Sequence, residues 1–250
     1  MIAITDLVKT YGKFTAVDGV SLDVTPGEIH GFLGPNGAGK TTTLRMIAGL
    51  LKPTSGRILV NGHDLAVQPE AAKMSLGFIP DRPFIYEKLT AGEFLTFHGG
   101  LYGLGEPGVV DRVREMLDLF ELGKWENELV ESFSHGMKQR LVMSAAFLHR
   151  PRSVVVDEPM VGLDPRGARL IKDVFRRMSM RGVAILMSTH TLEVAQEMCD
   201  RISIILKGRI IARGTVAELR TLSGGGDAHL TEVFLKLTGG SGLQELDEIV

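Results

Sequence analysis

Residues 34–42 read GPNGAGKTT, a stretch that fits the pattern G-x-x-x-x-G-K-[ST]. The apolar run Ile29–Leu33 precedes it, and the helix-like segment Lys40–Ala48 follows it. Glycines let successive backbone N–H groups converge on phosphate oxygens without obstruction by Cβ atoms, and a helix start adds the positive end of its dipole. This context predicts a strand, a phosphate-binding loop and a helix, and with them a nucleotide-binding α/β fold.

The residues of this loop have distinct expected roles. The Lys40 ammonium can bridge the terminal phosphates, and the Thr41 hydroxyl can ligate Mg²⁺. A structural glycine turn is the alternative, and the flanking strand and helix count against it. We expect the whole loop to bind ATP through Gly34, Pro35, Asn36, Gly37, Ala38, Gly39, Lys40, Thr41 and Thr42.

A second apolar strand ends in two adjacent carboxylates, in the sequence SVVVDEP of residues 153–159. This strand delivers Asp157 to the edge of the sheet, where it can hold Mg²⁺ through water. Glu158 points differently and can polarise the water that attacks the γ-phosphate. An Asp-Glu pair alone could be a solvated strand end. Behind a phosphate loop, the pair predicts metal binding and hydrolysis.

His190 is a second catalytic candidate, in the sequence MSTH at the end of the expected strand Val183–Ser188. It can contact the γ-phosphate or orient the attacking water, because parallel strands present their carboxyl ends to one ligand crevice. A lone histidine is usually structural, and only its position favours this one. The remaining histidines lack metal-ligand spacing and are interpreted as structural.

Strand-like and helix-like segments alternate along most of the chain. Strands are expected at Ile2–Leu7, Val17–Val24, Glu28–Leu33, Arg57–Val60, Leu76–Ile79, Val154–Val156, Val183–Ser188, Ile202–Leu206 and Arg209–Ala212. Helices are expected at Lys40–Ala48, Ala91–Leu101, Val109–Leu119, Met137–Leu148, Arg166–Met180, Leu192–Cys199 and Leu230–Leu237. The alternation predicts an α/β nucleotide-binding domain over residues 1–223, with a helical subdomain inserted at about 84–150. A C-terminal helix and a flexible tail are expected over 224–250.

The composition excludes several functional classes. Of 250 residues, 44% are hydrophobic and 23% charged, and the net charge of −2 gives no electrostatic reason to expect nucleic acid. The single cysteine, Cys199, offers neither a disulfide nor a metal cluster. The amino end lacks the pattern of a secretory signal, and the apolar runs are too short to span a bilayer. We therefore expect a soluble cytoplasmic protein, with any membrane part on another chain.

Residues 133–140 read FSHGMKQR, shortly before the Asp-Glu strand. This segment resembles the signature motif of ABC (ATP-binding cassette) ATPases, in the form Ser-x-Gly-Met-x-Gln-Arg. Together with the phosphate loop, the Asp-Glu pair, Gly162-Leu163-Asp164 and His190, the resemblance covers about residues 2–222. It implies a P-loop NTPase fold, with a RecA-like mixed sheet core, an antiparallel β subdomain and an inserted α-helical subdomain.

In that family the signature segment completes the ATP site of the opposite subunit in a head-to-tail dimer. Ser134 is a good helix N-cap, and the Gly136 N–H lies at a helix start, so the segment can bind an anion. Such a segment alone is more often only a cap. The resemblance assigns to the ATP of the opposite subunit the residues Ser134, His135, Gly136 and Met137.

Three further residues carry over by the same match. Tyr11 resembles the aromatic residue that stacks on adenine, and Asp164 resembles the carboxylate that links the two sites across the dimer interface. Asp81 stands where the family normally has Gln near Mg²⁺, and its shorter, charged side chain can reach the metal only through water. His135 and Met137 replace the commonest Gly and Gln of the signature, which leaves their contacts to the partner's ribose open.

The resemblance implies an ATPase that binds Mg-ATP, dimerises on ATP with a second copy or a homologue, and powers a separate integral-membrane permease. It would lie at the inner face of the cell membrane through that permease. The apolar residues of 83–89 are either core of the helical subdomain or a groove for a short permease helix. The stretches LTAGEFLTFHGGLYGL and VFLKLTG resemble ATPase subunits of exporters.

Two other classes are weighed as alternatives. A soluble ABC ATPase acting on nucleic acid or ribosomes usually carries long insertions or a second cassette, which this chain does not show. A small-molecule kinase or GTPase would have no use for the signature segment, and a guanine-reading Asn-Lys-x-Asp is absent. The transported cargo is not encoded in this chain. The tail after Gly239 is left open between a docking peptide and a segment without fixed structure.

Overall fold

The computed structural model describes residues 1–82, 84–105, 108–221 and 234–235. Its centre is a six-stranded sheet in the order β10-β9-β3-β8-β7-β6. These strands are Arg209–Gly214, Arg201–Leu206, Ile29–Leu33, Ala184–Thr189, Ser153–Asp157 and Leu76–Ile79. All neighbouring strands are parallel except β9 and β10, which form an antiparallel hairpin at the edge. The carboxyl ends of β3, β6, β7, β8 and β9 therefore meet at one edge, where the functional loops begin.

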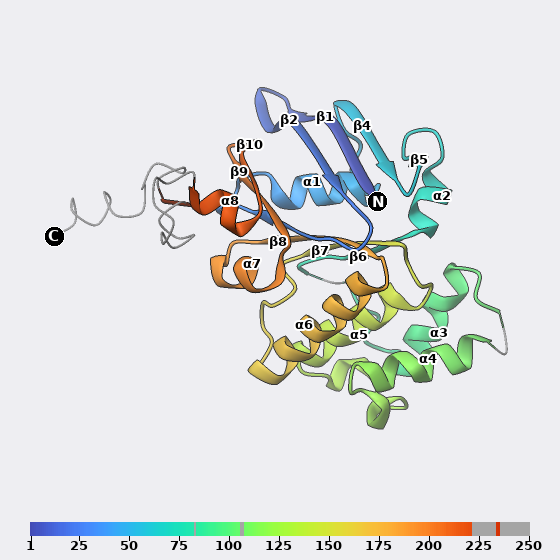
Figure 1. The fold of residues 1–250 in the computed structure, drawn as a ribbon. Helices are drawn as coiled ribbons and strands as arrows, with labels where there is room; N and C mark the ends of the chain where they lie inside the picture. The colour runs from blue at the N-terminus through green and yellow to red at the C-terminus, as the bar shows by residue number, and fades with distance from the viewer. Residues whose placement is uncertain (83, 106–107, 222–233, 236–250) are drawn as a thin grey trace.

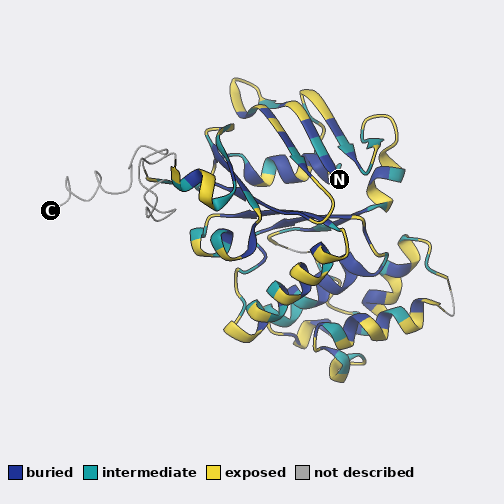
Figure 2. Ribbon diagram, viewed as in Figure 1, coloured by how far each residue is buried: buried dark blue, intermediate teal, exposed yellow. Residues whose placement is uncertain are grey.

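The sheet is apolar on both faces because both faces are covered. Along β7, Val154 and Val156 contribute to one buried core, while Val155 between them contributes to another. The same alternation is found in β8, where Ile185 and Leu186 face opposite cores. Figure 2 shows these strands as buried, while exposed residues lie on the outer sides of the helices, in loops and on the antiparallel sheet. Continuous apolar strands are the pattern expected for a parallel sheet between two layers.

A second, four-stranded antiparallel sheet lies over one face, in the order β2-β1-β4-β5. Its strands are Phe14–Val24, Ile2–Tyr11, Ser55–Val60 and His63–Asp64. Helix α1, Lys40–Ile47, lies between the two sheets, where Leu44, Met46 and Ile47 are fully buried (Figure 1). The small helix α2, Pro69–Met74, follows at the end of this layer.

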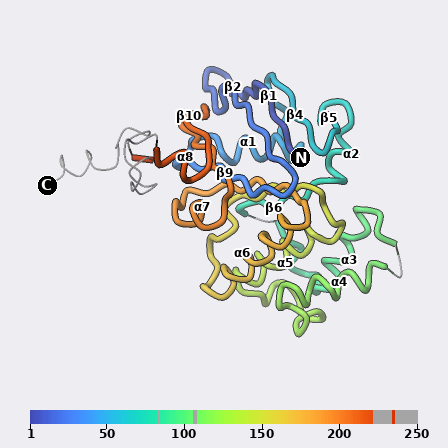
Figure 3. The backbone as a smooth tube through the Cα atoms, viewed as in Figure 1, coloured from blue at the N-terminus to red at the C-terminus, as the bar shows by residue number. Residues whose placement is uncertain are grey.

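The opposite face of the central sheet is covered by helices. The chain leaves the sheet after β6, builds α3, α4 and α5, and returns to β7 directly beside β6 (Figure 3). These helices and the later ones are α3 Ala91–Leu101, α4 Gly108–Leu119, α5 His135–Phe147, α6 Pro165–Met180, α7 Leu192–Met198 and α8 Val216–Thr221. Two 3-10 turns, Gly123–Trp125 and Val130–Ser132, connect α4 to α5.

Local sequence explains where the first of these helices begins. Thr90 accepts a hydrogen bond from the Glu93 N–H at 3.2 Å, and the Glu93 carboxylate accepts one from the Thr90 N–H at 2.8 Å. This reciprocal capping box satisfies two N–H groups that the helix itself leaves unpaired, and it starts α3 at Ala91.

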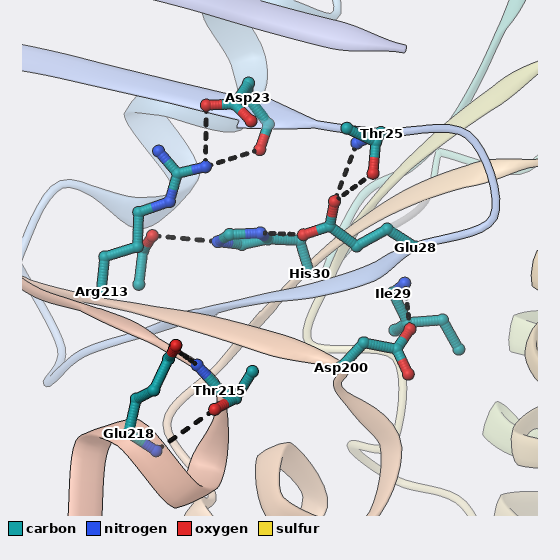
Figure 4. Close-up of polar contacts among 10 residues, drawn as sticks. Asp23, Thr25, Glu28, Ile29, His30, Asp200, Arg213, Thr215 and Glu218 are labelled. Atoms are coloured by element: carbon teal, nitrogen blue, oxygen red, sulfur yellow. Dashed lines mark hydrogen bonds and ion pairs between the residues drawn. The ribbon is translucent and has the colours of Figure 1, made fainter. Parts of the chain in front are cut away.

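Two sets of polar contacts lie where the two sheets meet, a buried one around His30 and a partly exposed ion pair between Arg213 and Asp23 (Figure 4). His30 of β3 is fully buried, its Nδ1 lies 2.8 Å from Glu28 Oε1, and its Nε2 lies 2.9 Å from Ser203 Oγ. Glu28 also accepts hydrogen bonds from the backbone and hydroxyl of Thr25. Arg213 of β10 donates to Asp23 of β2 at 2.8 Å. Every polar atom of the His30 ring is thus partnered, as burial requires.

The predicted fold class is confirmed, and the differences from the predicted elements are local. The strands predicted to end at Leu7 and to begin at Val17 continue to Tyr11 and Phe14, where the register of the pair shifts several times. Helices α2 and α8 were not predicted. Most of the predicted helix Leu230–Leu237 and the tail after it lie outside the described residues. Within the described part of the chain, no helix is long and apolar enough to cross a membrane.

Candidate functional site

The predicted phosphate loop connects β3 to α1 and is clamped between the two sheets. A Cβ atom on Gly34 would lie 2.4 Å from the Ile205 carbonyl oxygen. A Cβ atom on Gly39 would lie 2.5 Å from the Ala16 carbonyl oxygen, and Gly39 has a φ of +106°. Only glycine fits at either position, so the pattern of the loop reflects its packing as well as its use.

Lys40 lies at the start of α1 with its side chain buried beneath the loop. Its ammonium donates to the carbonyl oxygens of Gly34 at 2.7 Å and Pro35 at 3.3 Å, and it lies 3.7 Å from Glu158 Oε1. Burial lowers the pKa of Lys40, while the carboxylates of Glu158 and Asp157 act in the opposite direction. The structure thus holds a cation within a glycine-rich loop at the start of a helix, which is an arrangement suited to a triphosphate.

A cavity of about 360 Å³ lies over this loop. It is lined by Tyr11, Phe14, Ala16, Asn36, Gly37, Ala38, Gly39, Lys40, Thr41, Thr42, Asp81 and Glu158. Seven of the nine predicted loop residues line it, and Gly34 and Pro35 lie beneath as acceptors for Lys40. Tyr11 is 50% exposed at the end of β1, which leaves its ring available to a planar ligand.

Sequence reasoning missed Phe14 in this cavity. Phe14 is directly paired with Tyr11 across the hairpin turn of β1 and β2, and its side chain is 64% exposed. Two exposed aromatic rings therefore stand together at the open side of the phosphate loop. The signal was present in the sequence as an aromatic residue on each side of Gly12-Lys13, a turn in which Gly12 has a positive φ.

The second predicted group lies at the ends of β7 and β8. Asp157 is buried, and the Ser188 hydroxyl donates a hydrogen bond to its carboxylate. Glu158 Oε1 lies 2.9 Å from His190 Nδ1. The Glu158 N–H donates to the Ser188 carbonyl oxygen at 3.3 Å and to the Ser188 hydroxyl at 3.2 Å. The structure brings together the catalytic candidates Glu158 and His190, with Lys40 close by.

The backbone of Glu158 is in the left-handed region, with a φ of +51°. A non-glycine residue adopts this conformation rarely, and it is found most often where a side chain has to be aimed. Here it turns the carboxylate of Glu158 toward Lys40 and His190, while Asp157 before it stays in the sheet.

A second cavity, of about 720 Å³, adjoins the first. Asn36, Asp81 and Glu158 line both cavities. His190 and His135 also line the second one, so His135 of the signature segment lies on the same cavity as the catalytic candidates. Among its other lining residues, Ile85 belongs to the apolar segment of residues 83–89, and Phe133, Lys138 and Gln139 belong to the signature stretch. Sequence reasoning did not single out Arg82 and Val161.

The remaining predicted residues do not line the loop cavity. Ser134 is the N-cap of α5 and accepts a hydrogen bond from the Met137 N–H at 3.3 Å. Gly136 lies in the first turn, and the Met137 side chain packs against the main core. Asp164 caps α6 by accepting from the Gly167 N–H at 2.7 Å, a local role that sequence reasoning did not include. The signature segment therefore presents a helix start that the phosphate loop of its own chain does not use.

Comparison with known proteins agrees with this geometry. A family model described as "ABC transporter" matches residues 17–161. The linearmycin resistance ATP-binding protein LnrL of Bacillus subtilis (strain 168) is 38% identical, over 90% of this chain and 72% of the relative. The daunorubicin resistance ATP-binding protein DrrA3 of Streptomyces coeruleorubidus is 39% identical, over 87% of this chain and 69% of the relative.

A solved structure gives the same result. An ATP-binding subunit of an ABC transporter superimposes with a TM-score of 0.89 at 35% identity, covering 95% of this chain and 99% of the other. The matched family region includes the phosphate loop, the signature segment and the Asp157–Glu158 pair. The chain belongs to the ABC transporter family, as one of its ATP-binding, ATP-hydrolysing subunits.

Proposed function

We propose that two copies of this chain bind two molecules of Mg-ATP between them. Each nucleotide is held by the Lys40 loop of one chain and the Ser134 segment of the other. The observation that carries this proposal is the division of the site. The loop cavity contains Lys40, Glu158 and the aromatic pair, but neither Ser134 nor Gly136. A helix start that presents N–H groups away from its own phosphate loop is suited to the phosphate of a second chain.

In the hydrolytic step, Glu158 polarises the attacking water and His190 orients the carboxylate. Their 2.9 Å contact supports these roles, because a base that is held in place reacts from one geometry. Lys40 stabilises negative charge on the terminal phosphates. ATP acts as glue between the chains through its γ-phosphate, and hydrolysis removes that contact and loosens the dimer.

Mg²⁺ is assigned to Thr41, Asp157 and, through water, Asp81. The described residues contain no cluster of three His, Cys, Asp or Glu side chains that could hold a metal by itself. A single buried carboxylate, Asp157, beside an exposed hydroxyl, Thr41, fits a cation that takes its other oxygens from phosphates and water. Bound Mg²⁺ supplies charge neutralisation of the phosphate oxygens.

The permease contact is assigned to a groove of about 910 Å³ beside the second cavity. Phe84 is 82% exposed, and its ring stands edge-on to Tyr86, which in turn stands edge-on to Phe97. Ile85 and Leu89 instead pack partly against the core, which supports the core interpretation for these two residues, and the groove is proposed for the exposed aromatic residues. An apolar groove rimmed by Glu87, Lys88 and Lys138 suits a short amphipathic helix.

The direction of transport proposed is export. The names of two relatives support this proposal, since LnrL is named for linearmycin resistance and DrrA3 for daunorubicin resistance. A chain of this family acting in export would lie at the inner face of the cell membrane and be attached there through its permease. Residues 1–223 would form the ATPase domain, with the helical subdomain at about 84–150 in contact with that partner.

A mixing experiment tests the shared site. Lys40→Ala removes the loop cation, and Ser134→Asp keeps a good N-cap while placing a negative charge beside the partner's phosphate. Each variant alone should be inactive. In a mixed dimer one site carries both defects and the other carries neither, so mixing should restore part of the ATPase activity. An active Ser134→Asp variant, or mixtures as inactive as their components, would refute the shared site.

A further inference from the structure

A groove of about 630 Å³ lies away from the nucleotide site, between α4, the end of α5, α6 and the start of β8. Arg150, Pro151 and Val183 line it just before the amino ends of β7 and β8, so the groove is at the opposite edge of the sheet from Glu158 and His190. Its polar rim consists of Arg112, Glu115, Arg150, Arg177 and Arg181. Four arginines surround one glutamate in a protein whose net charge is −2.

One of these arginines is fully used by the fold. Arg112 donates to the carbonyl oxygens of Phe147 at 2.7 Å and Leu148 at 3.0 Å, at the end of α5. It also forms an ion pair with Glu115 at 2.6 Å. These bonds satisfy the donors of Arg112 and pair the charge of Glu115. Neither residue therefore balances the positive charge of the other three arginines.

The other three arginines remain available to a ligand. Arg150 is 77% exposed in its side chain and only approaches Glu115, at 3.8 Å. Arg177 and Arg181 are exposed and have no ion-pair partner among the residues that the structure describes. They are four positions apart at the end of α6, a spacing at which like charges repel each other. An acidic ligand would relieve this repulsion.

The rest of the groove is apolar. Its walls are the side chains of Met116, Leu119, Phe147, Val174, Met178 and Val183, together with Pro151. Methionine side chains adapt to ligands of varied shape, and two of them lie here. The groove therefore suits a ligand with apolar groups on one side and several carboxylates on the other.

We propose that the acidic end of this chain, residues 243–250, binds in this groove. Its sequence is LQELDEIV, in which Leu243, Leu246, Ile249 and Val250 are apolar, and Glu245, Asp247 and Glu248 are acidic. Three carboxylates match the three available arginines, and the apolar residues match the apolar walls of the groove. This segment lies outside the described residues, and the assignment rests on its sequence and on the groove.

Eight positions separate Leu235 from Leu243, and an extended chain of that length spans about 27 Å. The experiment below distinguishes binding within one chain from binding to a second copy.

A fluorescent peptide of residues 241–250 provides the test. The receptor is the full chain with its own tail acids neutralised by Glu245→Gln, Asp247→Asn and Glu248→Gln, so that the groove is open. This receptor should bind the peptide, and the wild-type chain should bind it at least about tenfold more weakly, because its own tail competes at high effective concentration. Adding Arg177→Glu and Arg181→Glu to the receptor should weaken binding by at least about tenfold.

The matched control places Arg114→Glu and Arg169→Glu in the same receptor. Arg114 lies on α4 and Arg169 on α6, two helices that line the groove, but neither residue lines it. The net charge changes equally in the two variants. The control should bind the peptide like the receptor. Equal binding by the groove variant and the control, or no binding by the open receptor, would overturn the proposal. Equal binding by wild type and open receptor would overturn binding within one chain.

Discussion

His190 Nδ1 lies 2.9 Å from Glu158 Oε1, and this contact joins the ends of two neighbouring parallel strands, β7 and β8. The same carboxylate oxygen lies 3.7 Å from the Lys40 ammonium. Glu158 is thus held between a ring that can orient it and a cation that can reach phosphate. The roles proposed for these three residues lead to separate expectations.

Glu158→Gln should keep ATP binding and lower turnover by about 10²- to 10⁴-fold, since the amide cannot accept the proton of the attacking water. Because ATP then persists, the variant should form a stable dimer with Mg-ATP, visible by light scattering. Glu128→Gln, at an exposed loop position, is the control and should leave activity unchanged. A Glu158→Gln protein that stays monomeric at saturating Mg-ATP would contradict the dimer mechanism.

His190→Ala should lower kcat by about 10²-fold and leave the KM for ATP nearly unchanged, because the ring positions Glu158 rather than holding the ground-state nucleotide. His190→Gln should recover part of the loss, since its amide can still donate to Glu158. Steady-state ATPase kinetics measure both. His63→Ala, on β5, serves as control. An effect confined to KM would assign His190 to binding instead.

Asp81→Asn separates two effects of the carboxylate that lines both cavities. If Asp81 approaches Mg²⁺ through water, removing its charge should raise the Mg²⁺ concentration for half-maximal ATPase activity by about 2- to 10-fold. Binding of ATP without Mg²⁺ should become tighter, because a repulsive charge is lost. Titrations with and without metal measure the two effects. An unchanged Mg²⁺ dependence would remove Asp81 from the metal site.

Tyr11→Ala and Phe14→Ala should each weaken ATP binding by about tenfold, because the aromatic pair at the mouth of the loop cavity is the surface available to stack on adenine. Lys13→Ala changes the same hairpin turn without removing a ring and should bind normally. Calorimetric titration with ATP checks this. Should Phe14→Ala bind like wild type, Tyr11 alone would carry the stacking.

The buried network around His30 predicts that stability falls in acid. Burial lowers the pKa of His30 from 6.5, so the unfolded chain binds the proton more readily than the folded chain. The free energy of unfolding should therefore decrease as the pH falls below about 6.5, by at most about 1.4 kcal/mol per pH unit from this group.

A second loss should follow at lower pH. Burial alone would raise the pKa of Glu28, but hydrogen bonds from His30 and Thr25 outweigh it and lower the pKa to about 2. The stability contributed by Glu28 is present above about pH 4.5 and lost as the pH falls toward 2. Urea unfolding between pH 7 and 2 tests both losses, and His30→Gln should flatten the dependence above pH 5. A wild-type midpoint that does not change between pH 7 and 5 would contradict the assignment.

The sequence predicted the parts of the fold whose ends are determined by residues close to them in the chain. Strand β6 and helix α3 have the predicted bounds, because an apolar run and a capping box mark their ends. The outer halves of β1 and β2 were missed, since their alternation is interrupted by bulges that only pairing reveals. Phe14 was missed for the same reason, as its pairing with Tyr11 is a property of the hairpin.

The candidate site likewise contains residues that local sequence predicts and residues whose contacts depend on packing. The loop and the Asp157–Glu158 pair could be predicted because short spacing encodes their geometry. The contacts of Asp164 with its own helix, and of His135 with the cavity of Glu158, depend on how distant segments pack. The available arginines likewise come from the end of α6 and from the loop between α5 and β7, and they have no signature in the linear sequence.

The carbonyl oxygens of Ala16 and Ile205 lie so close to Gly39 and Gly34 that a Cβ atom does not fit there, and this affects how the protein tolerates mutation. The conformation of the phosphate loop therefore depends on the spacing between the two sheets that enclose it. A substitution that shifts either sheet by a fraction of an ångström should weaken ATP binding even when the substituted residue does not contact ATP. Surveys of inactive variants should accordingly find positions in β2 and β9 that never contact the nucleotide.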